Sequence, residues 1–298
     1  MPAINASAAS SPDAVTGSPG RPTEIEEATN RWFIHPMSRR VVDVLARTPI
    51  TPNQVSIASV FMAAGGALCY ARLTWPVSAL AGLLLMIAWH VLDGADGDLA
   101  RRTGRASAIG ELVDGVCDHV SQGCLYIALA WMAQATLGPT AWALMAGAAL
   151  SHFIQANAYE TGRKTYRRWV YGADWMRQTQ AAPGGNLLQT LLGGLYVGLS
   201  TLVSPGEAAV EGAMIPRLQA GGDTAATARA AYRAAHMGLV KASSWLSSNN
   251  RTMAAFLAVL AMRPAWFFIY EITALNLTLA LVLVVRGANN RRLAAALA

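Results

Sequence analysis

The feature that most constrains this chain is a series of long apolar runs separated by short connections. Five are plain, at residues 55–73, 76–92, 112–137, 141–158 and 266–285. They match the roughly 20 residues that cross about 30 Å of hydrocarbon. Only 13% of the 298 residues are charged and 54% are hydrophobic, whereas a soluble domain carries about 25% charge. Lipid is the expected solvent, which excludes a soluble enzyme, a disordered chain and a disulfide scaffold.

A sixth span is predicted less clearly. The apolar run 252–262 is too short by itself and reaches the length of a span only when part of the polar stretch 241–251 is included. Residues 186–203 could also be taken for a span, but their glycines and polar side chains favour an interfacial helix. The predicted fold is an all-α integral membrane protein with six transmembrane helices. An N-terminal amphipathic juxtamembrane helix precedes them, and a helical insert separates helices 4 and 5.

Composition divides the chain into five regions. We expect a disordered tail without a signal peptide at 1–22, the juxtamembrane helix at 23–48, catalytic transmembrane helices 1–4 at 49–159, a cytoplasmic or interfacial helical insert at 160–240, and helices 5–6 with a C-terminal tail at 241–298. Within the insert, the alanine-rich stretch 224–240 predicts a helix.

Arginine placement predicts the orientation. Basic residues gather before the first span, after the second, after the fourth and at the end of the chain, while the opposite connections offer little beyond Arg72 and Arg263. Because cytoplasmic loops are enriched in Lys and Arg, both termini are predicted cytoplasmic, in a bacterial inner membrane. The net charge of +6 lies beside apolar segments, so membrane lipids rather than nucleic acid are the expected partners. The three cysteines have no CxxC spacing, which argues against zinc and disulfides.

Acidic residues gather where the second and third spans meet, in the segment 93–118, DGADGDLARRTGRASAIGELVDGVCD. At about 100° per helical residue, Asp93 and Asp96 share one face, while Asp98 points away as a bystander. Asp114 and Asp118 share a face of the next helix. Two carboxylate pairs are therefore expected to confront each other across a helical hairpin, where acids usually mark a functional site.

Facing carboxylates repel unless a cation lies between them. All-oxygen ligation favours one or two Mg²⁺ or Mn²⁺ ions rather than zinc. Gly97 and Ala100 leave room for a ligand, and Arg101 offers a charge suited to a diphosphate. The pattern predicts metal-assisted phosphoryl transfer. The rival is a cation- or proton-coupled transporter, but such charges favour the midplane of repeated halves, whereas these cluster at one end without a second copy.

The segment resembles the signature of the CDP-alcohol phosphotransferase (phosphatidyltransferase) family, D-x2-D-G-x2-A-R-x8-G-x3-D-x3-D. All its fixed positions are matched, by Asp93, Asp96, Gly97, Ala100, Arg101, Gly110, Asp114 and Asp118. A weaker resemblance covers residues 31–158, including the T-P-N-Q-V-S stretch at 51–56. Beyond residue 160 only the general plan of six spans is similar.

The resemblance implies an enzyme of phospholipid synthesis that moves a substituted phosphate from a CDP-linked donor to an alcohol and releases CMP. By similarity, the metal ligands are Asp93, Asp96 and Asp114, and Asp118 is the base that deprotonates the acceptor and also touches the metal. The nucleotide and diphosphate site is assigned to Asn53, Gly97, Ala100, Arg101, Arg105 and Ser107.

Two directions of transfer remain open. CDP-diacylglycerol can donate to a small polar alcohol such as inositol phosphate, glycerol phosphate or serine, or CDP-choline or CDP-ethanolamine can donate to a lipid alcohol. The short chain favours the first. The resemblance also implies a homodimer and an active site at the cytoplasmic side, while the insert leaves the acceptor undetermined.

Candidate acceptor ligands come from the later spans. His152, Gln155, Tyr159 and Arg163 share a helical face of the fourth span, and Asn250 with Arg251 interrupts the fifth. An interhelical hydrogen-bond network explains the first group equally well. For Asn250 and Arg251, anchoring at the membrane interface is the alternative explanation. The basic stretch at 163–168 fits an acceptor phosphate or a lipid-facing loop.

Overall fold

The computed structural model describes residues 22–72, 75–172 and 198–298, and this part of the chain is helical, with no strand. Residues 1–21 of the tail expected at 1–22 and most of the helix expected at 186–203 lie outside the described residues. In order, the elements are η1 (Thr23–Ile25), η2 (Asn30–Ile34), α1 (His35–Leu45), α2 (Pro52–Ala71), α3 (Val77–Arg102), α4 (Ala108–Leu137), α5 (Thr140–Tyr171), α8 (Glu207–Ala220), α9 (Gly222–Ala242), η3 (Ser243–Leu246), α10 (Ser248–Leu260), α11 (Ala265–Tyr270), η4 (Glu271–Leu275) and α12 (Asn276–Leu297).

Among the described residues, three elements are long and apolar enough to cross a membrane: α2, α3 and the continuous helical run Ala265–Leu297. They correspond to three of the six predicted spans. α4 and α5 also have the length, with 30 and 32 residues, but polar side chains along them lower their hydropathy. α10 has only 13 residues, fewer than a span needs. The part of the chain that the structure describes thus supports a helical membrane protein with three candidate spans.

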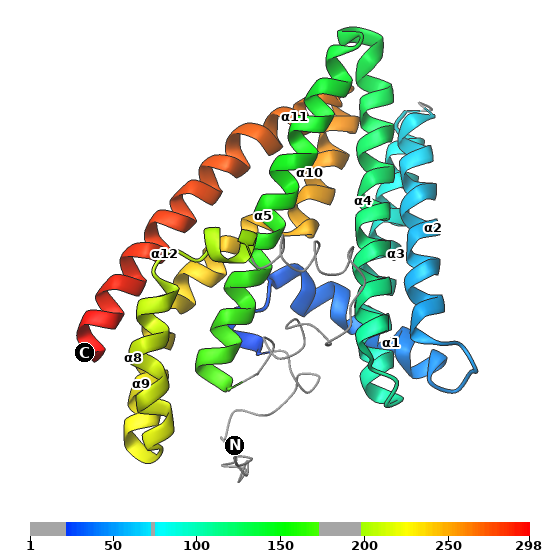
Figure 1. The fold of residues 1–298 in the computed structure, drawn as a ribbon. Helices are drawn as coiled ribbons and strands as arrows, with labels where there is room; N and C mark the ends of the chain where they lie inside the picture. The colour runs from blue at the N-terminus through cyan, green and yellow to red at the C-terminus, as the bar shows by residue number, and fades with distance from the viewer. Residues whose placement is uncertain (1–21, 73–74, 173–197) are drawn as a thin grey trace, which may run out of the picture.

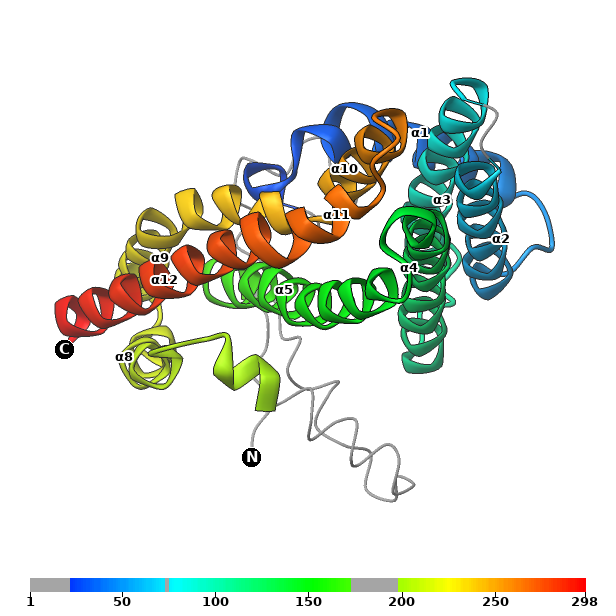
Figure 2. The ribbon, with the colours of Figure 1, turned by 90° about the horizontal axis from the view of Figure 1, so that it is seen from above.

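The helices α2, α3 and α4 pack together at one side of the molecule (Figures 1 and 2). A capping box begins α2, because the Thr51 hydroxyl accepts from the Gln54 amide and the Gln54 side chain accepts from the Thr51 amide. Small residues bring α2 and α3 close together. A Cβ added to Gly66 would lie 3.0 Å from the carbonyl oxygen of Gly82, and one on Gly82 would collide with the buried ring of Tyr70.

A sharp turn joins α4 to α5 at the top of Figure 1. Gly138 ends α4 at a φ of 56°, a conformation that favours glycine, and Pro139 precedes α5. From this turn α5 runs away from α4 toward α9 and α12 (Figure 2). It therefore links the motif-bearing helices to the second half of the chain.

The predicted juxtamembrane segment forms η2 and α1. Ile34 and Val42 are buried, whereas Trp32, Phe33 and Val44 are exposed. The Ser38 hydroxyl donates to the carbonyl oxygen of Val91 on α3 at 2.8 Å. This helix is anchored to α3 and leaves an apolar surface open, as an interfacial helix requires.

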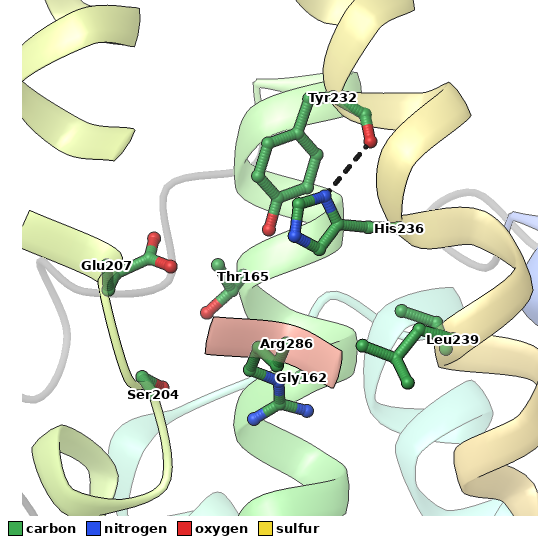
Figure 3. Close-up of a pocket in the computed structure, with 9 residues that line it drawn as sticks. Gly162, Thr165, Ser204, Glu207, Tyr232, His236, Leu239 and Arg286 are labelled. Carbon is green, nitrogen blue, oxygen red and sulfur yellow. Dashed lines mark hydrogen bonds between the residues drawn. The ribbon is translucent and has the colours of Figure 1, made fainter. Parts of the chain in front are cut away.

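The described part of the insert forms a helical unit on α5 and α12. α8 and α9 pack against each other and against α12, and α9 also packs against α5. The predicted helix at 224–240 is confirmed by α9. A small cavity of about 10 Å³ lies at their junction, the size of one water molecule. Figure 3 shows Glu207, Tyr232, His236 and Arg286 around this cavity.

Candidate functional site

The acidic motif lies on the C-terminal end of α3 and the first turns of α4. Asp93 and Asp96 come from α3, and Asp114 and Asp118 from α4. The two helices are joined by a short connection in which Gly104 has a φ of 66°. A tight turn of this kind returns the chain beside itself, so the two acidic faces meet.

The four carboxylates interact in two pairs across the helices. Asp118 contacts Asp93 through their side chains, and Asp114 contacts Asp96 in the same way. Asp118 also interacts electrostatically with both members of the other pair. Four acids of like charge thus share one small volume, an arrangement that costs free energy unless protons or cations compensate it.

Ser56 is a site residue that the sequence analysis missed. Its hydroxyl, on α2, donates to Oδ2 of Asp96, and the backbone amide of Gly97 donates to Oδ1. Asp96 is only 4% exposed, so these two donors fix its orientation. The T-P-N-Q-V-S stretch at 51–56 is the part of the sequence from which Ser56 could have been found. It caps α2 at Thr51 and places Ser56 beside the motif.

The helical angle predicted that Asp98 is a bystander. In the structure it pairs with Arg101. Nη2 of Arg101 donates to Oδ1 of Asp98, and the guanidinium lies over Gly97, with Nη1 3.4 Å from where a Cβ there would be. The space that Gly97 leaves is therefore occupied by Arg101. The arginine side chain remains 42% exposed, so a ligand can reach it.

The other proposed nucleotide residues lie at the head of α4. Ser107 caps this helix by accepting from the Gly110 amide at 3.0 Å. A Cβ on Gly110 would lie 3.2 Å from Oγ of Ser107 and 3.6 Å from Oδ1 of Asn53, so both side chains lie close to Gly110. Arg105 is exposed in the connection, and Ala100 is on the last turns of α3.

A divalent cation suits the donors of this cluster but not their present arrangement. Carboxylate oxygens are the ligands that Mg²⁺ and Mn²⁺ prefer. Within the described residues, however, no three His, Cys, Asp or Glu side chains converge to hold a metal ion. The carboxyl groups are paired two by two instead, so coordination requires their side chains to turn.

Two of the acceptor candidates belong to a buried network. The guanidinium of Arg251 donates from Nε to Oε1 of Glu271 at 2.9 Å and from Nη2 to Oε1 of Gln155 at 2.6 Å. Gln155 in turn donates to Oδ1 of Asn276 at 2.8 Å. Arg251 and Glu271 are fully buried. The alternative of an interhelical hydrogen-bond network describes the contacts of Gln155. Arg251, for which interfacial anchoring was the alternative, belongs to the same buried network.

The remaining candidates lie on α5 and α10 and make separate contacts. Tyr159 donates its hydroxyl to Oε1 of Glu27, and Arg163 pairs with Glu160 at 3.0 Å. His152 lies edge-on to the Tyr126 ring, with centroids 5.9 Å apart. Asn250 donates to the Ser244 carbonyl at 2.8 Å, a bond that joins the start of α10 to η3.

Comparison with known proteins decides the family. The sequence profile for CDP-alcohol phosphatidyltransferase matches residues 49–210, more than half of the chain. The chain belongs to the CDP-alcohol phosphatidyltransferase family. The match contains all four aspartates together with α2, Ser56 and the whole of α5, and it ends within α8.

Individual relatives of this phosphatidyltransferase match shorter stretches. The chain is 34% identical over 128 residues to the bifunctional IPC transferase and DIPP synthase of Thermococcus kodakarensis, covering 43% of this chain and 27% of that protein. It is 31% identical over 98 residues to the phosphatidylinositol phosphate synthase of Mycolicibacterium smegmatis, covering 33% of this chain and 42% of that one. The matches thus span less than half the length of these curated relatives.

Proposed function

We propose that this chain is a membrane phosphatidyltransferase of phospholipid synthesis that transfers the phosphatidyl group of CDP-diacylglycerol to a small alcohol and releases CMP. The observation that carries the proposal is the pairing of Asp93 with Asp118 and of Asp96 with Asp114, inside the region that matches the family. Similarity to phosphatidylinositol phosphate synthases favours CDP-diacylglycerol as donor over CDP-choline or CDP-ethanolamine.

The proposed roles follow from the surroundings of each side chain. Asp93, Asp96, Asp114 and Asp118 would hold one or two Mg²⁺ or Mn²⁺ ions, which when bound neutralise the diphosphate and the departing CMP. Ser56 fixes Asp96. Arg101, with its exposed guanidinium, would contact the diphosphate, and Asn53 and Ser107 at the head of α4 would lie beside the nucleotide.

Asp118 is proposed as the base. It takes the proton from the acceptor hydroxyl, whose oxygen forms the new bond to the phosphatidyl phosphorus while the bond from that phosphorus to CMP breaks. Tyr159 and Arg163 on α5 are proposed to contact the acceptor, because Glu160, the partner of Arg163, interacts electrostatically with Asp118.

We also propose that the site opens to the cytoplasm in a homodimer. The basic residues support this orientation, since α1, the α3–α4 connection and the end of α5 lie toward one end of the molecule (Figure 1), and positive residues favour the cytoplasmic face. A bacterial inner membrane is the proposed location.

Purified protein tests the activity directly. With CDP-diacylglycerol and inositol phosphate, glycerol phosphate, serine or choline as acceptor, CMP release is expected with at least one acceptor. It should stop with EDTA and return with Mg²⁺ or Mn²⁺. CMP release only from CDP-choline or CDP-ethanolamine with diacylglycerol would reverse the direction of transfer. A chain that releases no CMP with any pair, but carries cations into liposomes, would be the rival transporter.

A further inference from the structure

We propose that Glu27 is a positioning residue for the acceptor side of the active site. Glu27 lies between η1 and η2, outside the region that matches the family, which begins at residue 49. The inference rests on the proposed function, because it concerns how the chain holds the residues assigned to the acceptor.

Both oxygens of the Glu27 carboxylate are engaged by other elements. The Tyr159 hydroxyl on α5 donates to Oε1, and the Asn249 amide on α10 donates to Oε2 at 3.0 Å. Asn249 also donates to Oδ1 of Asn30 at 2.7 Å. The carboxylate therefore joins the N-terminal segment to two helices that are remote in sequence, and its charge strengthens each bond.

Tyr159 connects Glu27 to Arg163. The guanidinium carbon of Arg163 lies 5.3 Å from the centre of the Tyr159 ring, within the range of a cation–π interaction. Nη1 of Arg163 donates to Oε1 of Glu160 at 3.0 Å. With the tyrosine held at its hydroxyl by Glu27, the ring has a fixed place, and the arginine stacked on it is fixed as well.

Arg163 keeps one donor for a ligand. Its Nε is buried and has no hydrogen-bond partner among the described residues. A buried N–H without a partner is costly, and such groups call for an explanation. An oxygen atom of a bound acceptor, either hydroxyl or phosphate, would satisfy it.

The same face of α5 lies near the motif. Glu160 interacts electrostatically with Asp118, and Arg167, one turn beyond Arg163, does so with Arg101. A series of contacts thus runs from Glu27 through Tyr159 and Arg163 to Glu160, and the charge of Glu160 acts on the proposed base. Glu27 acts on the acceptor through Arg163 and does not touch the reacting atoms.

Matched variants test this role. Glu27→Ala removes the carboxylate, Glu27→Gln keeps an oxygen for the Tyr159 hydroxyl, and Tyr159→Phe removes the hydroxyl but keeps the ring. Glu26→Gln is the control, because Glu26 lies in the same segment but pairs with His35. Initial rates of CMP release are measured for each protein with inositol phosphate, glycerol phosphate, serine and choline, and KM is determined separately for donor and acceptor.

Glu27→Ala is expected to raise the acceptor KM about tenfold, the size of one lost hydrogen bond to a charged group. The donor KM should stay within about twofold, since the donor residues lie on α2, α3 and α4. In Glu27→Gln the acceptor KM should return most of the way to the wild-type value. Tyr159→Phe should also raise the acceptor KM, and the double variant Glu27→Ala with Tyr159→Phe should have no higher acceptor KM than Glu27→Ala alone. Glu26→Gln should resemble the wild type.

An unchanged acceptor KM in both Glu27→Ala and Tyr159→Phe would overturn the role of Glu27 and leave the proposed function intact. A fall in kcat together with an equal rise in the KM of both donor and acceptor would also overturn it, because that pattern indicates general disruption of the fold. Absence of CMP release from the wild-type protein would instead reject the proposed function, and the role of Glu27 with it.

Discussion

Two aspartates only two residues apart on α3 show how position on a helix decides what one side chain does. Asp96 receives donors from Ser56 and Gly97 and contacts Asp114, whereas Asp98 pairs with Arg101. Successive helical residues are separated by about 100°, so these two side chains leave the helix in nearly opposite directions. The sequence predicted this division, but not that Asp98 would hold the arginine of the motif.

Asp118→Asn is the decisive substitution at the scale of the residue. An amide cannot take the acceptor proton, so kcat for CMP release should fall by about 10²–10⁴-fold, the usual contribution of a general base. The amide is nearly the same size as the carboxylate, and the fold should persist. Initial-rate kinetics on detergent-purified protein measure the effect.

The control is Asp223→Asn, on the exposed first turn of α9, which should keep full activity. Full activity in Asp118→Asn would show that another group is the base.

Helix packing decides how the elements position these side chains. α2 lies against both α3 and α4, and it presents Ser56 to Asp96. The close approach of α2 and α3 depends on Gly66 and Gly82, since a side chain on either would meet the other helix. A stripe of small residues predicts such an approach, but the sequence does not say which helix is the neighbour.

Gly82→Ala tests the packing of these elements. The added methyl group would overlap the buried Tyr70 ring, so α2 and α3 must separate, at a cost of about 1–3 kcal/mol for overpacking. The thermal unfolding temperature in detergent should fall, and activity should fall with it because Ser56 moves away from Asp96.

Gly123→Ala on α4 is the matched control for Gly82→Ala, because nothing lies within 4 Å of the added atom. It should unfold at the wild-type temperature. Equal unfolding temperatures for the two variants would mean that the contact between α2 and α3 tolerates a side chain at residue 82.

At the scale of the molecule, the insert and the N-terminal segment close around α5. Glu24 accepts hydrogen bonds from Tyr166 and Tyr171 at 2.6 Å each and pairs with Arg233 of α9. Burial opposes the charge of Glu24, but these donors outweigh it and lower the pKa of its carboxyl. His236 on α9 joins the insert to α12 through Asn290, at 2.8 Å.

Attachment of the insert should weaken below about pH 6.5. Burial lowers the pKa of His236 from its ordinary 6.5. The charge of Arg286 also lowers it, while the hydrogen bonds of the ring to Oδ1 of Asn290 and to the carbonyl oxygen of Tyr232 act in the opposite direction. A histidine with a lowered folded pKa contributes stability above its unfolded pKa, and this contribution is lost as the pH falls through the folded value. Hydrogen exchange of α9 between pH 7.5 and 5.5 measures the effect.

His236→Gln separates the effect of protonating His236 from the effect of protonating its neighbour Glu207. Burial raises the pKa of Glu207, in the same cavity, although the Trp169 hydrogen bond opposes this, so protonation of Glu207 favours docking at low pH. In the variant the acid-induced opening of α9 should vanish or reverse. An opening of the same size in both proteins would exclude His236 as its cause.

The sequence by itself determined the helical class, the apolar character, three of the spans and the residues of the motif, because these depend on periodicity and spacing within one segment. Only the tertiary structure decided which partners the polar groups take. Arg251 meets Glu271 and Gln155, Glu27 meets Tyr159 and Asn249, and Asp96 meets Ser56. The reason is physical: a buried polar group must find a partner, and several partners along the chain satisfy that need equally until packing brings one of them within reach.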